Sequence, residues 1–240
     1  MQTIQRRSPV QFGSPRMTET RNNWTIALSY DDEGKGPFLV DLCHKTRWDL
    51  QDKGLDAISP LDLKIPGAPG TCSLENGVLI NRMNRTQAAI WLLDTATPEL
   101  PAETGYTDVT ESTVFLALFG PRIFSIAEKL TSLDFLDPGK TAPFLFQGPF
   151  SHVPCQIVTL EKNSDESGGI LLTCSRGYSH SMVHAIRDAG SEFGLRPAGE
   201  NRFSAWLNGL TEYPTEYWRS IGLIFHGKEG CLICIMTKEG

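Results

Sequence analysis

Hydrophobic positions change from a strand pattern to a helix pattern within one short stretch of the chain. Residues 114–119 are a continuous apolar run, Gly120 and Pro121 follow, and apolar residues from Ile123 onward recur at the spacing of a helix face. Proline suits the first turn of a helix because its missing N–H would have no partner there. The pattern therefore predicts a strand that leads directly into a helix over 122–130, with Pro121 in the first turn.

A second strand and helix follow in the same order further along the chain. Residues 169–174 are apolar, residues 175–179 have the composition of a turn and a helix cap, and the next apolar residues lie at helical spacing. The helix is expected to end near Gly190, since glycine is common just beyond a helix C-terminus. Two strand–helix units predict the α+β class. The apolar face of the helix comprises Met182, Val183, Ile186 and Ala189.

Shorter apolar runs predict most of the remaining strands. The runs at 77–83 and 88–93 are separated by four polar residues, a spacing typical of a hairpin. Residues 53–58 are expected to form a short helix, which the prolines and glycines of 60–70 end. Further strands are expected over 38–42, 45–50 and 156–160, a proline- and glycine-rich connection over 137–154, and a last hairpin over 221–225 and 231–236.

Composition divides the chain into three regions. Residues 1–23 are polar and are expected to form an N-terminal arm. Residues 94–112 are rich in proline, threonine and glutamate and lack periodicity, so they are expected to link two subdomains. The predicted organisation is an arm over 1–23, a first subdomain with its linker over 24–112, and a second subdomain with the final hairpin over 113–240.

Size, charge and hydropathy disfavour several classes of protein. The chain has 240 residues, 40% of them hydrophobic, which is enough to bury a sizeable core. Its formal net charge is −6, so binding to nucleic acid or to an anionic membrane is disfavoured. No apolar run approaches the roughly 20 residues of a membrane span, and the N-terminus lacks the apolar core of a secretion signal. A cytoplasmic protein is expected.

Cysteine and histidine spacing predicts no metal site. The six cysteines do not make a disulfide-dense scaffold, so buried free thiols are expected. Cys231 and Cys234 form a lone CxxC on an expected strand, and no second pair of ligands accompanies them. His180 and His184 are four residues apart on an expected helix but lack a third ligand. We expect surface or partner-facing histidines there.

Six short strings occur along the chain in a fixed order. They are Phe38 to His44 (FLVDLCH), Asn76 to Asn81 (NGVLIN), Ile90 to Leu93 (IWLL), Val114 to Leu130 with its Gly-Pro step, Ser175 to Ser179 (SRGYS) and Glu192 to Gly199 (EFGLRPAG). Together they resemble the folate-binding T-protein (aminomethyltransferase) superfamily, and within it the gamma subunit of heterotetrameric sarcosine oxidase. The resemblance covers roughly residues 37–207. It implies an α+β T-protein-like fold with two α/β sandwich subdomains and mostly antiparallel sheets.

The chain departs from this family at positions that carry chemistry. The resemblance implies that aminomethyltransferases end the hairpin string with an Asp pair whose carboxylate lies against the folate. Ile80 and Asn81 occupy the matching positions here. An amide can orient a pterin by hydrogen bonds, but it cannot act as a base or stabilise positive charge in a transition state. The family's Glu that grips the pterin ring is matched, within a residue or two, by Glu166.

Five residues are candidates for binding a cofactor. Asn81 and Glu166 come from the positions matched to the family, Arg82 and Arg85 from the hairpin, and Arg202 follows the Pro-Ala-Gly turn. Guanidinium groups can hold the carboxylates of a folate tail bidentately. The alternative for the two hairpin arginines is an exposed turn with solvated charges. No catalytic residue is assigned.

The resemblance implies a subunit, like the sarcosine oxidase gamma subunit, of a tetrahydrofolate-linked, amine-demethylating complex, and this subunit is expected to be either non-catalytic or folate-binding. In such a complex a flavin on a partner chain oxidises a methylamine, and tetrahydrofolate collects the one-carbon unit. The expected partners are subunits of a flavin-dependent amine oxidase or dehydrogenase, and the expected state is a hetero-oligomer. One alternative is a stand-alone tetrahydrofolate-dependent aminomethyl or methyl transferase, in which Asn81 and Glu166 replace the usual acids. Another is a folate-reading assembly factor, whose Lys-Gly-Cys motif is loosely echoed by residues 227–231.

Overall fold

The computed structural model describes residues 5–103, 105–163 and 167–212. Contacts group the chain up to Phe203 into one compact unit and the chain from Ser204 onward into another. The hairpin predicted over 221–236 lies outside the described residues. No helix in the described part of the chain is long and apolar enough to cross a membrane.

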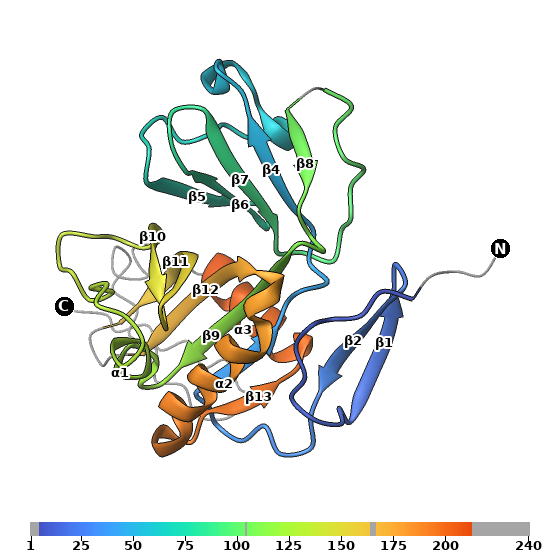
Figure 1. Ribbon diagram of the computed structural model, residues 1–240, viewed down its shortest axis with the longest axis vertical. Coiled ribbons are helices and arrows are strands. Elements are labelled where there is room, and N and C mark those ends of the chain that lie inside the picture. The colour runs from blue at the N-terminus through green and yellow to red at the C-terminus, as the bar shows by residue number, and fades with distance from the viewer. Residues whose placement is uncertain (1–4, 104, 164–166, 213–240) are drawn as a thin grey trace, which may run out of the picture. The chain divides into compact units, whose positions relative to one another are not determined.

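A six-stranded sheet forms one layer of the first unit (Figure 1). Its strands run antiparallel to their neighbours, except that β13 is parallel to β3. The strands predicted at 38–42, 114–119, 156–160 and 169–174 are confirmed as members of this sheet. In sheet order the strands are β10 (Phe144–Phe150), β11 (Val153–Lys162), β12 (Gly168–Ser175), β9 (Thr113–Gly120), β3 (Phe38–Asp41) and β13 (Arg196–Ala198).

Two helices pack on one face of this sheet, α1 (Ile123–Glu128) and α2 (Ser179–Gly190). Both predicted helices are thereby confirmed. The prediction for Pro121 is wrong, because α1 begins after Arg122, which is its N-cap and has a left-handed φ of 60°. Gly120 also has a positive φ, 112°, so the chain turns sharply before helical hydrogen bonding can begin.

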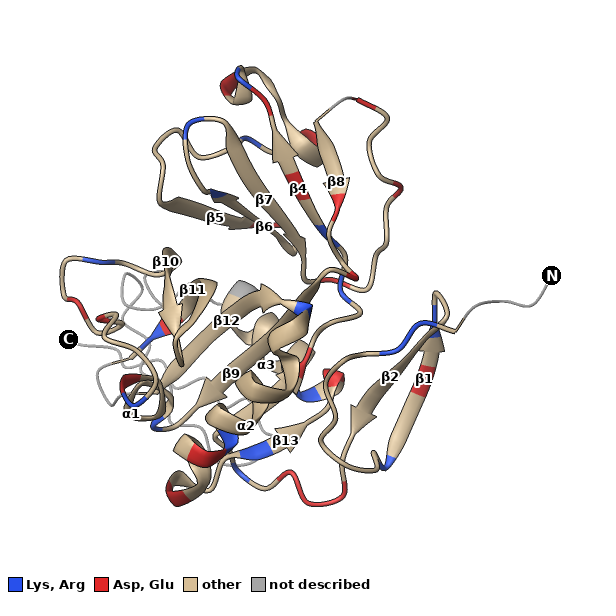
Figure 2. Ribbon diagram, in the orientation of Figure 1, with Lys and Arg blue, Asp and Glu red and all other residues tan. Residues whose placement is uncertain are grey.

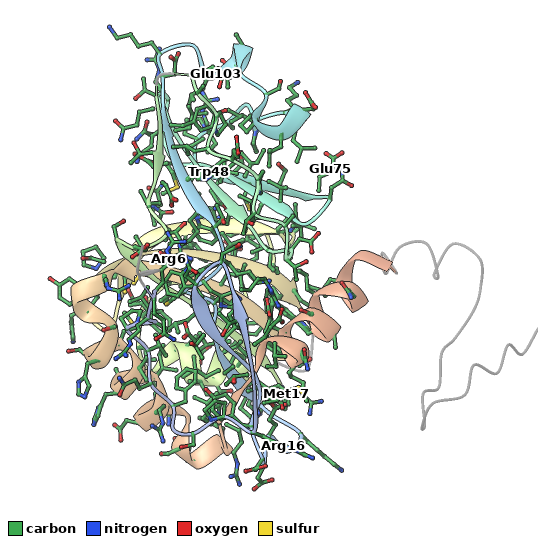
Figure 3. The ribbon with its side chains drawn as sticks, turned by 90° about the vertical axis from the view of Figure 1, so that its right-hand side faces the viewer. Arg6, Arg16, Met17, Trp48, Glu75 and Glu103 are labelled. Atoms are coloured by element: carbon green, nitrogen blue, oxygen red, sulfur yellow. The ribbon has the colours of Figure 1, made fainter. Side chains whose placement is uncertain are left out.

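A five-stranded antiparallel sheet forms a second layer. Its β6–β7 hairpin confirms the pairing predicted for 77–83 and 88–93. One face packs under the segment after β4, where two 3-10 turns, Leu55–Ala57 and Pro60–Asp62, replace the helix predicted over 53–58. Trp48 lies in this core and is 1% exposed (Figure 3). In sheet order the strands are β5 (Thr71–Glu75), β6 (Val78–Arg82), β7 (Gln87–Leu92), β4 (Arg47–Gln51) and β8 (Tyr106–Asp108).

The N-terminal part of the chain forms a separate hairpin. Residues of the predicted arm make up β1 (Met17–Arg21), which pairs antiparallel with β2 (Trp24–Ser29). Asn22 and Asn23 join the strands with φ values of 50° and 66°. A two-residue hairpin turn of type I′ requires positive φ at both positions, and asparagine tolerates that conformation.

Several elements were not predicted from the sequence, among them β10 and α3 (Glu200–Glu212). β10 lies in the connection expected over 137–154, and its Pro149 is tolerated because β10 is an edge strand of the sheet. α3 follows Gly199 at the end of the Pro-Ala-Gly turn. A Cβ atom at Gly199 would lie 2.2 Å from the main chain of Leu28, so only glycine allows this close approach of the turn to β2.

The two sheets draw strands from both sides of the predicted subdomain boundary. β3 comes from the region 24–112 but pairs with β9, which follows the boundary. β8 lies within the stretch expected to be a linker and pairs with β4. The predicted α+β class with mostly antiparallel sheets is confirmed, and the division at residue 112 stays a prediction.

A buried arginine holds the two places where the chain crosses between the sheets. Arg47 is 1% exposed, and burial lowers its pKa to about 10, so the guanidinium is charged at neutral pH. The ring of Phe115 lies 4.9 Å from the guanidinium carbon, close enough for a cation–π contact. The main-chain carbonyl groups that accept its N–H groups are those of Leu42, Cys43 and Lys45, between β3 and β4, of Thr110, between β8 and β9, and of Thr113, the first residue of β9.

The second face of the five-stranded sheet meets the six-stranded sheet. The rings of Trp91 on β7 and Phe115 on β9 pack edge to face with centroids 5.0 Å apart. Gln147 on β10 donates its amide N–H to the main-chain oxygen of Met83, at 2.8 Å. These four residues define what we call the inter-sheet layer.

Candidate functional site

Asn81, the residue matched to the family carboxylate, is buried beside the inter-sheet layer. It is 0% exposed, and neither its amide oxygen nor its amide nitrogen has a hydrogen-bond partner within the described residues. Because side chains alternate along a strand, Asn81 shares a face of β6 with Leu79, which stands opposite Trp91. Ile80 packs into the core on the other face. The Asn81 amide is therefore enclosed by the protein.

Arg82 points to the opposite face of β6 and is engaged by the protein itself. It is 4% exposed, and its guanidinium pairs with the carboxylate of Asp56 at 2.9 Å. It also donates to the main-chain oxygens of Asn84 and Arg85, at 2.9 and 3.1 Å. The Arg82 guanidinium thus ties the β6–β7 turn to the segment after β4.

The remaining candidates lie in different surroundings. Arg85 is exposed in the turn between β6 and β7. Arg202, on α3, lies 3.3 Å from the carboxylate of Glu33 and its guanidinium carbon lies 5.0 Å from the Phe38 ring centre. Glu166 is outside the described residues. The structure does not gather the described candidates into one cluster, and their role in holding a cofactor stays a prediction.

A groove of about 600 Å³ lies where β10, β11 and β12 approach the end of β6. Gln147, Gln156 and Thr173 stand next to one another across the three strands, and Met83 borders them. None of the described residues that line the groove carries a charge. The groove therefore offers neither a carboxylate for acid–base work nor a cation for an anionic tail. Sequence spacing gives no signal for it, because its polar residues come from three separate strands.

A buried group of charges surrounds Glu200, the first residue of α3. The carboxylate lies 2.5 Å from the ammonium of Lys45 and 3.0 Å from Nε2 of His44. Arg21 binds both carboxylate oxygens, at 3.0 and 3.1 Å. Acidic and basic residues also lie together on β1 (Figure 2), where Glu19 pairs with Arg21. The Glu200 carboxylate thus joins the N-terminal hairpin, the β3–β4 connection and α3.

The electrostatics of this group suit a structural role. Burial alone would raise the pKa of the Glu200 carboxyl, but hydrogen bonds from His44 and Arg21 and the charge of Lys45 hold it well below its usual range. Burial lowers the pKa of Lys45, against the pull of Glu200. A cavity of about 180 Å³ adjoins the group. Since each cation already faces a carboxylate, the charges neutralise one another.

The sequence gives no signal for this group, because its members are far apart in the chain. Arg21 and Glu200 are 179 residues apart, and no local pattern links them. Cys43 and His44, adjacent in the chain, face opposite ways: the Cys43 thiol lies against the main chain of Phe115, and His44 faces Glu200. Within the described part of the chain, no three histidine, cysteine or acidic side chains are grouped to share a metal ion.

Glu200→Gln is expected to lower the free energy of unfolding at pH 7 by about 3 kcal/mol, because the cations of Lys45 and Arg21 then face a neutral amide. A carboxyl whose pKa is lowered by folding stabilises the protein above its ordinary pKa, and this stabilisation disappears as the pH falls. The difference between wild type and variant should therefore shrink below pH 4.5, the ordinary value. Urea unfolding over a series of pH values measures it.

Glu111→Gln is the matched control for this experiment. Glu111 also pairs with an arginine, Arg6, but is 54% exposed. Exposed pairs contribute about 1 kcal/mol or less, so the control should change little at any pH. An effect of Glu200→Gln that stays constant from pH 7 to pH 3 would contradict the assignment of the stabilisation to the Glu200 charge.

Asn81→Leu is expected to raise the free energy of unfolding by about 1–3 kcal/mol, because leucine has a similar volume and removes buried polar atoms that lack partners. Equilibrium urea unfolding of both proteins measures the change. Asn84→Leu is the control, since Asn84 is exposed and its side-chain oxygen accepts the N–H of Thr86 at 2.8 Å. A loss of stability in Asn81→Leu, greater than in the control, would show that the Asn81 amide has a partner.

Comparison with known proteins adds two similarities. No family model matches the chain. Over 122 residues, 51% of this chain, it is 27% identical to an aminomethyltransferase from Geobacillus thermodenitrificans (strain NG80-2). The match spans 32% of that protein, so the chain corresponds to about a third of its relative's length.

A solved structure shares the fold. It is a chain of the heterotetrameric sarcosine oxidase from Corynebacterium sp. U-96, determined in complex with pyrrole 2-carboxylate. The two chains superimpose with a TM-score of 0.52 and 18% sequence identity, over 66% of this chain and 85% of that one. The resemblance found in the sequence strings is thereby confirmed: this chain has a T-protein-like fold, similar in sequence to an aminomethyltransferase and in structure to a sarcosine oxidase chain.

Proposed function

We propose that this chain is a non-catalytic subunit of an amine-demethylating complex similar to sarcosine oxidase. A flavin on a partner chain oxidises the methylamine, and tetrahydrofolate receives the one-carbon unit on a partner chain as well. The observation that carries the proposal is the enclosed amide of Asn81, which stands at the position matched to the family carboxylate. The fold similarity to a chain of a heterotetrameric oxidase supports the proposed partners.

Acid–base chemistry argues against an active transferase. A carboxylate can accept a proton and stabilise an iminium-like cation, whereas an amide stays neutral and does neither. Burial adds a second obstacle, because a group that is 0% exposed cannot contact a ligand without a rearrangement of the sheets. A stand-alone transferase would need Asn81 to be accessible, so this alternative has less support.

The groove and Arg82 are also poorly suited to bind an anionic ligand. The groove beside the inter-sheet layer has no charged residue among those described. Arg82, one of the two hairpin arginines predicted to hold a folate carboxylate, is 4% exposed and already pairs with Asp56. A carboxylate ligand would have to displace that partner and reach a buried guanidinium. We therefore assign the folate chemistry of the complex to another subunit.

The proposed complex is cytoplasmic. The four cysteines in the described part of the chain, Cys43, Cys72, Cys155 and Cys174, are all free thiols. Free thiols are typical of reducing compartments, where structural disulfides are rare.

Co-expression with flavin-dependent amine oxidase subunits from the same genome tests the proposal. The chain is expected to co-purify with them in a fixed ratio, and the complex should show flavin absorbance and oxidise an N-methyl amine. Alone, the chain should self-associate in sedimentation velocity, because surface meant for partners is then exposed. An unrelated flavoenzyme serves as the control. A monomeric, stable chain that does not bind the amine oxidase subunits would overturn the proposal.

A further inference from the structure

Cys155 and Cys174 lie on neighbouring strands of the six-stranded sheet. In the β11–β12 register Gln156 stands opposite Thr173, and the next residues outward are Cys155 and Cys174. The paired register ends at Gln156 and Thr173, and the two cysteines lie one residue beyond it on adjacent strands. Because antiparallel strands are numbered in opposite directions, continuing the register by one step would bring the two cysteines face to face.

The two thiols border the same open groove. Each shifts the pKa of the other, and neither is in a disulfide. Both cysteines line the 600 Å³ groove, with 6% of Cys155 and 4% of Cys174 exposed. The protein thus holds two thiols together at the wall of a groove that a molecule as small as a peroxide can enter.

We infer that Cys155 and Cys174 are a peroxide-sensitive pair that closes reversibly to an interstrand disulfide. Residues opposite each other on antiparallel strands have Cα atoms about 4.5–5.5 Å apart. Disulfides span Cα separations of about 4.4–6.8 Å, so facing positions on antiparallel strands are close enough for the bond. The site is a modification site, distinct from the residues discussed for folate.

The chemistry of the pair favours Cys174 as the first to react. The neighbouring thiols shift each other's pKa, lowering that of Cys174 and raising that of Cys155, whose own S–H donates to the main-chain oxygen of Val153 at 3.2 Å. The Cys174 thiolate attacks one oxygen of hydrogen peroxide and becomes a sulfenic acid, and hydroxide leaves. The sulfur of Cys155 then attacks the sulfenic sulfur, the S–S bond forms, and water is released. In total two thiols and one hydrogen peroxide give one disulfide and two waters, and the thiol protons end up in the water.

A source of peroxide fits the proposed partners. A flavin-dependent oxidase releases hydrogen peroxide when dioxygen reoxidises its flavin, so the complex proposed above would generate the oxidant beside this chain. Only this choice of oxidant source rests on the proposed function. The disulfide itself can be tested on the isolated full chain with added hydrogen peroxide.

The test treats the full chain with hydrogen peroxide, blocks free thiols with an alkylating reagent and maps peptides without reduction. We expect a peptide pair that links Cys155 to Cys174 and lacks two hydrogens, and dithiothreitol should restore both thiols. If both cysteines are still alkylated as free thiols after peroxide has oxidised an equal concentration of glutathione, the inference is overturned. A disulfide that joins either of them to Cys72, Cys231 or Cys234 would overturn it too.

Single variants separate the roles of the two thiols. In Cys155→Ser, peroxide should leave a sulfenic acid on Cys174 that dimedone labels, because the resolving thiol is gone. In Cys174→Ser, dimedone labelling of Cys155 should be at least tenfold weaker. Cys72→Ser is the matched control and should still form the linked peptide. Equal labelling in the two variants would contradict the order of attack, and the wild-type peptide map decides the disulfide even if a variant fails to fold.

Discussion

Arg47 is a buried cation held by main-chain carbonyl groups, and both crossings between the sheets pass around it. The charge would be costly in the interior without partners, and the carbonyl groups of the two crossing segments would be costly without donors. The guanidinium donates its N–H groups to these carbonyl groups, so the hydrogen-bonding needs of both are met. The Phe115 ring covers the guanidinium at 4.9 Å. Because the segments before β4 and before β9 are fixed to the same group, the positions of the two sheets are linked at this point.

The attachment of both crossings to Arg47 also fixes the packing of the inter-sheet layer. Phe115, which contacts Arg47, also packs against Trp91 of the five-stranded sheet. Trp91 stands opposite Leu79, on the face of β6 that also carries Asn81. With both crossings fixed at Arg47, the two sheets meet over Asn81. This is the position at which the related transferases are expected to hold their carboxylate. The fold is kept, while the residue that would act on a ligand is neutral and enclosed.

Local sequence patterns predicted elements in which one uninterrupted run of residues carries the hydrophobic period of a strand or a helix. The strand and helix around Gly120 and Pro121 were found because a single run of apolar residues changes period there. β10 was missed because Gly148 and Pro149 interrupt its pattern, and only its place at the sheet edge makes proline acceptable. The apolar residues of α3 do follow helical spacing, so this helix could have been predicted.

Side-chain groupings were harder to predict than elements. The separation of Asn81 from Arg82 follows from strand alternation and was available from the sequence, since adjacent residues on a strand face opposite ways. The charges around Glu200 were not available, because they come from a hairpin, a loop and a helix that only the folded chain brings together. Whether Asn81 is open or enclosed also depended on how the sheets meet.

The enclosed position of Asn81 is the central claim, and calorimetric titration of the full chain with a reduced folate tests it most directly. We would use 5-formyltetrahydrofolate as a stable ligand. A non-catalytic subunit with a closed amide should give no saturable heat up to high ligand concentration. Saturable binding with a Kd near 1 μM, about −8 kcal/mol, would contradict the claim and show that the chain itself holds a folate.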